Sequence, residues 1–419
     1  MGKTAATSST APENALAQEM KAGQTRNLLL ATLASTMGFW AWTIIGPLAK
    51  TYAANMDLGA GQTSILVAMP ILVGAVARVP VGAMTDRYGG RLMFTVILGV
   101  TAPLVLLTAV VGQMNNFGML VFVAFFLGIA GTVFAIGIPF CSAWYESHRK
   151  GFATGVFGAG MVGTAVSAFF TPRLVAGLGY MGAHILIAVL VAVMAVICWL
   201  FLRESPTRRG VEPTPMLPKL KVAFGLKETW LLCFMYAIVF GAFVAFSNYL
   251  PTYLGNVYDF DATGAGTRTA GFAAAAVVAR PIGGTLADKV GPKLVSIASY
   301  VGAALLAVVV AFQPNAEHVY GPIFILMALF LGLGTGGVFA WVARASEPRT
   351  VGTVSGIIAA AGGLGGYFPP LVMGATYNEA QNSYFVGLIL LALFCVLGLI
   401  TCFILRNGGR VDERAAASA

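Results

Sequence analysis

The sequence predicts an all-α membrane protein with twelve transmembrane helices arranged as two six-helix repeats. Of its 419 residues, 58% are hydrophobic and only 10% are charged, and the mean hydropathy is +0.84, a composition far from that of a soluble domain. Apolar runs long enough to cross a bilayer recur along the whole chain. One charged motif also occurs twice at a separation of nearly half the chain, which indicates an internal duplication.

The predicted spans fall into two groups of six. The first half, residues 27–204, holds apolar runs at 28–52, 63–85, 92–112, 117–144, 151–171 and 180–203. The second half, residues 228–406, holds runs at 230–255, 266–287, 294–313, 320–343, 351–375 and 384–405. Residues 205–227 are polar and basic and are predicted to form a cytoplasmic loop between the halves. We expect a disordered cytoplasmic tail over residues 1–26, which lack the apolar core of a signal peptide, and a second cytoplasmic tail over 407–419.

The distribution of basic residues sets the predicted orientation. With the N-terminus in the cytoplasm, twenty Lys and Arg residues face the cytoplasm and only Lys50, Arg173 and Arg268 lie outside, as the positive-inside rule requires. Both termini are then cytoplasmic, in a multi-pass protein of the plasma membrane. The formal net charge of +9 reflects this topology, so we expect no nucleic-acid partner. The five cysteines show no CxxC spacing, so we expect no disulfide, no metal site and no cofactor.

The duplicated motif puts one arginine inside each half of the membrane domain. Arg78 lies eight residues (86 − 78) before the pair Asp86-Arg87, and Arg280 lies eight residues (288 − 280) before Asp288. The two arginines are 202 positions apart (280 − 78). A charged, Gly-containing turn is typical of a loop at the membrane surface, and eight residues of α-helix rise about 12 Å. Both arginines are therefore predicted to lie at membrane depth.

Two arginines inside a membrane need a chemical reason, because each costs about 2.5–3.5 kcal/mol on insertion scales. All sixteen acidic residues are predicted in tails, loops or helix ends, so no carboxylate is expected to pair with Arg78 or Arg280. Two guanidinium groups facing each other across the halves form an anion site, since a planar fork of donors suits a planar oxyanion. The alternative is that helix carbonyls cap both arginines and that their role is only structural.

Two glycine-dense segments repeat at nearly the same offset. Residues 151–163 match residues 352–366, and Gly151 and Gly352 are 201 positions apart (352 − 151). In a bilayer, small residues let helices approach closely, and they also expose backbone to a substrate or to a sliding neighbour. Gly160 and Gly363 are therefore candidate site residues. Plain helix packing is the alternative for most of these glycines.

The titratable residues favour exchange of one anion for another. Proton-driven carriers generally keep a carboxylate or histidine in the pathway. Here His148, His184 and His318 are all predicted in loops or at helix ends. A membrane enzyme is disfavoured because the sequence has no metal cluster, carboxylate pair or activated nucleophile. A receptor is disfavoured because only short loops lie outside the predicted spans.

From Phe39 to Leu405 the chain resembles the nitrate/nitrite porter family of the major facilitator superfamily. The most specific likeness is the run from Gly356 to Pro370, which ends Gly-Gly-Leu-Gly-Gly-Tyr-Phe-Pro-Pro and is similar to that family's second signature. The resemblance implies the major facilitator fold and a secondary transporter that moves nitrate and nitrite by alternating access. The resemblance also implies a role in nitrate assimilation, a small inorganic anion as the substrate, the lipid bilayer as surroundings and a monomeric state.

The resemblance also implies roles for individual residues. It makes Arg78 and Arg280 the arginines that clamp the anion, and Phe134, Tyr236 and Phe240 the aromatic residues around it. A delocalised anion tolerates aromatic walls, although ordinary packing explains a helical aromatic equally well.

The chain departs from the family at two positions of this expected site. Met161 and Thr335 stand where the family commonly has asparagines. The sequence therefore does not predict whether nitrate or nitrite is the preferred anion. The candidate substrate-binding set is Arg78, Arg280, Phe134, Tyr236, Phe240, Met161, Gly160 and Gly363. Proton symport of nitrate, or transport of another small anion such as formate or oxalate, is the alternative function.

Overall fold

The computed structural model describes residues 10–146, 149–208, 221, 223–315, 317–345 and 351–405. These residues form helices joined by short connections. The β-type pairing among them is one isolated bridge between Asn378 and Ser383. The first half contains α1 (Thr10–Trp42), α2 (Ala49–Met56), α3 (Ala60–Val76), α4 (Arg78–Tyr88), α5 (Gly90–Gln113), α6 (Phe117–Leu127), α7 (Val133–Ser142), α8 (Lys150–Gly158) and α9 (Gly163–Phe201). The second half contains α11 (Lys227–Tyr258), α12 (Ala262–Val290), α13 (Pro292–Ala311), α14 (Glu317–Ala345), α15 (Val351–Ala375) and α16 (Phe385–Ile404). Short 3₁₀ turns are η1 (Gly46–Leu48), η2 (Gly128–Thr132), η4 (Ala159–Val162), η5 (Pro206–Arg208) and η6 (Glu379–Gln381).

The described helices account for the twelve predicted crossings. Eleven continuous helical stretches are long and apolar enough to span a membrane, and one of them, Phe152–Phe201, is 50 residues long. Gly179 divides this stretch with the non-helical angles φ 74° and ψ 166°. The two parts correspond to the predicted spans 151–171 and 180–203, so the all-α, twelve-span fold class is confirmed.

The start of α1 differs from the expected tail. Helix α1 begins at Thr10, within the segment 1–26 that we expected to be disordered. The local sequence is rich in Ala, Gln and Glu, all good helix formers. The helix is also held in place, because the Gln24 side-chain amide donates to the Trp144 carbonyl oxygen at 2.9 Å. Residues 1–9, 209–220 and 406–419, which include most of the predicted loop between the halves and the second tail, lie outside the described residues.

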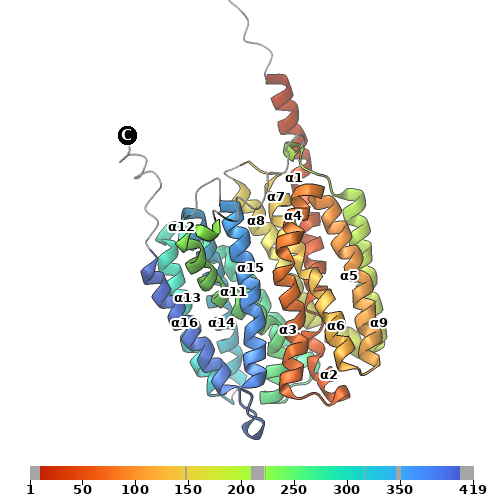
Figure 1. Ribbon diagram of the computed structural model, residues 1–419, viewed down its shortest axis with the longest axis vertical. Helices are drawn as coiled ribbons and strands as arrows, with labels where there is room; N and C mark the ends of the chain where they lie inside the picture. Colours follow the sequence, from red (N-terminus) through yellow and green to blue (C-terminus); the bar gives the residue numbers. More distant parts are fainter. Residues whose placement is uncertain are drawn as a thin grey trace, which may run out of the picture.

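The duplication is visible in two matching turns. Gly89 joins α4 to α5 and Gly291 joins α12 to α13, and both have φ 95°. Only glycine adopts this backbone readily, because a side chain would clash at positive φ. These two turns mark one end of the bundle, here named the basic end, where the start of α1 projects beyond the other helices (Figure 1). Helix α2 lies at the opposite end.

The two halves pack together along two long contacts, α3 against α15 and α9 against α12. Figure 1 shows α3 and α15 side by side in the middle of the bundle. At the opposite end, the Lys50 ammonium donates to the Gly255 carbonyl oxygen at 3.0 Å and lies 3.5 Å from the Asp259 carboxylate. Deeper in the bundle, Ser64 Oγ donates to the Tyr249 hydroxyl at 2.9 Å. The halves are therefore closed together at the opposite end.

The turn at Gly179 gives a test of the fold. Gly179→Ala should lower the free energy of unfolding by about 1–3 kcal/mol, because the backbone region it occupies is nearly restricted to glycine. An added Cβ meets no atom within 4 Å there, so backbone strain alone is tested. The measurement is thermal unfolding of the purified protein in detergent. Gly177→Ala is the matched control, since it also adds a Cβ into open space but at a helical position. Equal melting temperatures for the two variants would contradict the strained turn.

Candidate functional site

Arg78 occupies a break between two helices. Helix α3 ends at Val76 and α4 begins at Arg78, with Ala77 (φ −70°, ψ −11°) between them. Pro80 explains the break, because proline has no N–H for the carbonyl oxygen four residues earlier and its ring clashes with that carbonyl. The break lies within the apolar stretch Ala60–Tyr88, and Arg78 is only 4% exposed. The predicted membrane depth of this arginine is consistent with that position.

The Arg78 guanidinium reaches across to the second half. Its Nη1 donates to the carbonyl oxygen of Ala359 in α15 at 3.0 Å. Its Nε and Nη2 are buried and have no acceptor among the described residues. A helix carbonyl therefore caps one of the three guanidinium nitrogens, which supports the structural alternative only in part. Unmade hydrogen bonds on a buried charge are costly, so the remaining donors favour an acceptor from outside the protein.

Arg280 lies within α12, directly before Pro281, and has different partners. Its Nη2 donates to the Tyr236 hydroxyl at 3.1 Å, and its Nη1 lies 3.0 Å from the Met161 sulfur. A thioether is a weak acceptor, and a tyrosine hydroxyl is neutral. Both partners therefore leave the positive charge of Arg280 uncompensated.

Two aromatic rings connect the arginines. Arg78 Cζ lies 5.6 Å from the centre of the Phe134 ring and 5.8 Å from that of Phe240. Arg280 Cζ lies 5.3 Å and 5.8 Å from the same two centres. Both guanidinium groups thus border the same space, and the rings stabilise them by cation–π attraction. The predicted set Arg78, Arg280, Phe134 and Phe240 is brought together, with Tyr236 stacked on Phe240 at 4.9 Å.

Two further aromatic residues belong to this cluster, and no sequence pattern predicted them. Trp42 lies 6.0 Å from Arg78 Cζ, and Phe339 lies 5.5 Å from Arg280 Cζ. The Trp42 indole donates to the Pro70 carbonyl oxygen at 2.8 Å, which fixes the ring beside α3. A lone aromatic in an apolar helix usually packs in a core, so its spacing carries no signal for a site.

Close approach explains the glycines of α15. An added Cβ at Gly362 would lie 2.9 Å from Phe240 Cδ1 and even closer to the Tyr236 ring. At Gly363 it would lie 2.7 Å from the Ala75 Cβ and 3.2 Å from Arg78 Nη1. Gly362, which sequence reasoning missed, therefore makes room for the aromatic stack. Gly363 makes room for α3 and for the arginine.

Gly160 and Thr335 make contacts within their own halves. An added Cβ at Gly160 would lie 2.7 Å from the Ser35 Cβ and 2.8 Å from the Thr32 carbonyl oxygen, so this glycine serves packing of η4 on α1 within the first half. Thr335 Oγ1 donates to the Gly332 carbonyl oxygen of its own helix at 2.7 Å. Its hydroxyl proton is therefore unavailable to an anion.

One histidine also differs from expectation. His184 was predicted at a helix end, and it lies five residues (184 − 179) after the Gly179 turn, but its side chain is fully buried. Its Nδ1 lies 2.8 Å from the Tyr180 carbonyl oxygen, and its Nε2 has no partner among the described residues. Packing of α9 against its neighbours, which the local sequence does not reveal, causes this burial.

The chemistry of the cluster is that of an anion site. In the part of the chain that the structure describes, no group of three or more His, Cys, Asp or Glu side chains is arranged like metal ligands. The acids nearest in sequence to the arginines, Asp86 and Asp288, lie in the last turns of α4 and α12. What the cluster offers is two positive charges, unfilled N–H donors and aromatic walls, which suit a small delocalised anion.

Comparison with known proteins gives consistent matches over nearly the whole chain. The sequence profile of the Major Facilitator Superfamily matches residues 29–370 and 261–417. The "Probable nitrate/nitrite transporter NarK2" of Mycobacterium tuberculosis strain H37Rv is 53% identical over 380 residues, covering 91% of this chain and 95% of that protein. The "Nitrite extrusion protein" of Bacillus subtilis strain 168 is 33% identical over 368 residues, covering 87% and 90%.

A solved structure shares the arrangement of helices. It is a bacterial homologue of the human lysosomal transporter Spinster in an inward-facing, unoccupied conformation, with a TM-score of 0.70. The sequences are 19% identical, and the match covers 93% of this chain and 96% of the other. At this identity the likeness concerns the fold alone.

The donor geometry gives a test of the cluster. Arg78→Lys and Arg280→Lys should each weaken binding of a small oxyanion such as nitrate at least tenfold, about 1.4 kcal/mol, because an ammonium keeps the charge but lacks the planar fork. Equilibrium binding to the purified protein is the measurement. Arg87→Lys, at an exposed position on the basic end, is the matched control. Wild-type affinity in either site variant would remove that arginine from the anion site.

Proposed function

We propose that this chain, which belongs to the Major Facilitator Superfamily, carries nitrate and nitrite across the membrane by alternating access. Its family makes it a multi-pass membrane transporter and not an enzyme. The observation that carries the proposal is that the guanidinium groups of Arg78 and Arg280 border the same two aromatic rings. The names of the relatives from M. tuberculosis and B. subtilis support nitrate and nitrite as the anions.

In this proposal, each arginine binds the anion from a different half of the protein. Arg78 offers the nitrogens Nε and Nη2, which have no protein acceptor among the described residues. Arg280 offers its charge from a position fixed by Tyr236 and Met161. Phe134 and Phe240 form the walls. A planar anion with spread charge fits, because guanidinium groups donate in a plane and aromatic rings exclude water without demanding hydrogen bonds.

The arrangement of the halves supports alternating access. The site lies between them, and at the opposite end they are joined through Lys50 and Gly255. At the basic end, Gly155 and Gly356, which occupy equivalent places in the two repeats (356 − 155 = 201), have no atom within 4 Å of an added Cβ. Positive-inside bias supports a cytoplasmic location for the basic end and for both termini. We further propose a monomer in a bacterial plasma membrane, since the named relatives are bacterial.

The electrostatics of the site support exchange of one anion for another. Without an anion, Arg78 and Arg280 present two positive charges that no carboxylate in the described part of the chain compensates. Such a pair is unfavourable where the dielectric constant is low, so rearrangement of the empty protein should be slower than rearrangement with an anion bridging the halves. The substrate itself then permits the change between the two facing states.

Proton symport is the second candidate, and one observation favours it. His184 is buried and keeps one ring nitrogen without a partner among the described residues. It lies after the Gly179 turn of α9, in the first half alone, whereas the arginines belong to both halves. A histidine in that place can bind a proton, whereas exchange of one anion for another needs no proton-binding step.

Counterflow distinguishes the two candidates. Isotopic nitrate uptake into proteoliposomes should be at least tenfold faster with internal nitrite than without it, because the loaded site rearranges faster than the empty one. A protonophore should leave this uptake unchanged, and so should His184→Gln. Vesicles loaded with formate or oxalate test the other small anions. Strong uptake into empty vesicles that is driven by an imposed pH gradient and lost in His184→Gln would establish symport instead.

The glycines of α15 give a test of movement between the halves. Gly363→Ala should slow exchange at least tenfold and lower nitrate affinity by a smaller factor, because the new Cβ lies 2.7 Å from the Ala75 Cβ, which hinders the approach of the halves, and 3.2 Å from Arg78 Nη1. Gly356→Ala is the matched control in the same helix, since its Cβ enters open space. Gly160→Ala should lower stability instead, because its contacts lie within one half. Equal losses of rate and affinity in Gly363→Ala would make this glycine a purely binding or packing residue.

A further inference from the structure

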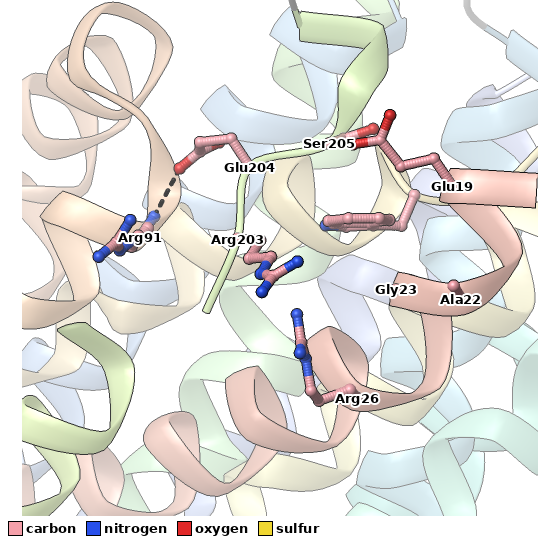
Figure 2. Close-up of a pocket in the computed structure, with 9 residues that line it drawn as sticks. Glu19, Ala22, Gly23, Arg26, Arg91, Arg203, Glu204 and Ser205 are labelled. Carbon is pink, nitrogen blue, oxygen red and sulfur yellow. Dashed lines mark hydrogen bonds between the residues drawn. The ribbon is translucent and has the colours of Figure 1, made fainter. Parts of the chain in front are cut away.

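A cavity rich in arginine lies at the basic end, within the first half alone. It has a volume of about 660 Å³, and its walls include Arg26 of α1, Arg91 of α5 and Arg203, which follows α9. Figure 2 shows these side chains around one space together with Glu19 and Glu204. The cavity is separate from the site between the halves, and nothing in the transport proposal uses it.

Two of its arginines carry uncompensated charge. The guanidinium groups of Arg26 and Arg203 point toward one another in Figure 2. Neither forms an ion pair or hydrogen bond with a side chain that the structure describes. The backbone at Arg203 is tied to α1, because the Arg203 N–H donates to Asn27 Oδ1 at 2.9 Å and the Asn27 amide donates to the Gly23 carbonyl oxygen at 2.9 Å. Both side chains are exposed, and two like charges that face each other favour an anion between them.

The other charges of the cavity have partners. Arg91 Nε donates to the Trp199 carbonyl oxygen at 2.9 Å. Glu204 accepts the backbone N–H of Arg91 at 2.7 Å, at the start of α5, where a carboxylate is favourable. Glu19 also has an interaction of its own. Arg26 and Arg203 therefore remain as the pair available to a ligand.

A buried donor in the same wall also lacks an acceptor. Trp144 is 3% exposed, and its indole N–H has no hydrogen-bond partner among the described residues. Its six-membered ring lies against Gly23, which leaves no room there for a Cβ. Buried indole N–H groups are normally hydrogen-bonded, and this one lacks an acceptor oxygen among the described residues.

The surroundings of the cavity indicate the source of that oxygen. On α1, the exposed side chains of Leu29 and Leu33 follow Arg26 at helical spacing, so all three lie on one face. At the end of α9, Leu200 and Val196 are 61% and 56% exposed before the chain reaches Arg203. Apolar surface thus leads away from both arginines along the membrane-spanning helices, as the acyl chains of a lipid require.

We propose that this cavity binds the phosphate group of an anionic membrane lipid. Arg26 and Arg203 clamp the phosphate oxygens, and the Trp144 indole donates to a headgroup oxygen. The acyl chains lie on the exposed apolar faces of α1 and α9. The bound lipid joins the start of α1 to the end of α9 and so fixes the N-terminal extension of α1 on the first half.

The test compares lipids bound to the full-length purified protein. Native mass spectrometry should show phosphatidylglycerol bound at least tenfold more tightly than phosphatidylcholine, whose headgroup carries a compensating positive charge. Arg26→Gln/Arg203→Gln should remove this preference. Lys221→Gln/Lys227→Gln is the matched control, because it removes two exposed positive charges at the same end and should keep the preference. Nitrate binding should be unchanged in both double variants.

Two further measurements test the lipid site, one with a Trp144 variant and one with inorganic phosphate. Trp144→Phe keeps the ring but deletes the N–H, and it should weaken phosphatidylglycerol binding about threefold or more while phosphatidylcholine binding stays the same. Unchanged phosphatidylglycerol binding in the folded double variant or in Trp144→Phe would overturn the site. Inorganic phosphate is the soluble probe. If millimolar phosphate stabilises the protein as well as phosphatidylglycerol does, and does so through Arg26 and Arg203, the lipid assignment is wrong and the ligand is a soluble phosphate.

Discussion

Two positive charges that share aromatic walls, one buried and one partly buried, have no carboxylate partner among the described residues, and this is the constraint on which the structure depends. Arg78 and Arg280 stand on opposite halves, and each is held by neutral groups: a carbonyl oxygen for the first, a tyrosine hydroxyl and a thioether for the second. Neutral partners hold the side chains in place but leave their charge for a ligand. The glycines of α15 serve the same end, because they let the helix approach the arginine and the aromatic stack without a side chain between them.

The sequence predicted the parts of this arrangement that repeat. The offset of 202 between Arg78 and Arg280 indicated the duplication, and the matching φ of 95° at Gly89 and Gly291 is its structural counterpart. The charge pattern and apolar runs predicted twelve spans because each rests on local composition. Phe134, Tyr236 and Phe240 came from family resemblance, since nothing in their spacing separates them from ordinary core residues.

What the sequence could not predict depends on packing between distant segments. Trp42 and Phe339 join the cluster only because their helices cross beside the arginines. His184 is buried by neighbours of α9, although it was predicted in a loop or at a helix end. The extension of α1 back to Thr10 was hidden by polar composition, which is as compatible with an anchored helix as with a disordered tail. Gly160 looked equivalent to Gly363, but it packs within one half.

The unequal capping of the two arginines has a consequence for the path of the cargo. The repeats began as copies, yet among the described residues Arg280 has side-chain hydrogen-bond partners, whereas Arg78 donates to a backbone carbonyl and two of its nitrogens have no acceptor. On the proposed function, an anion would be gripped more firmly by the first half and would sit off the pseudo-symmetry axis. The anion would then stay bound to the first half when the two halves separate, and movement of the second half would control access to the site. Divergence after duplication would thus have given the first half the larger part in anion binding and the second half the larger part in gating.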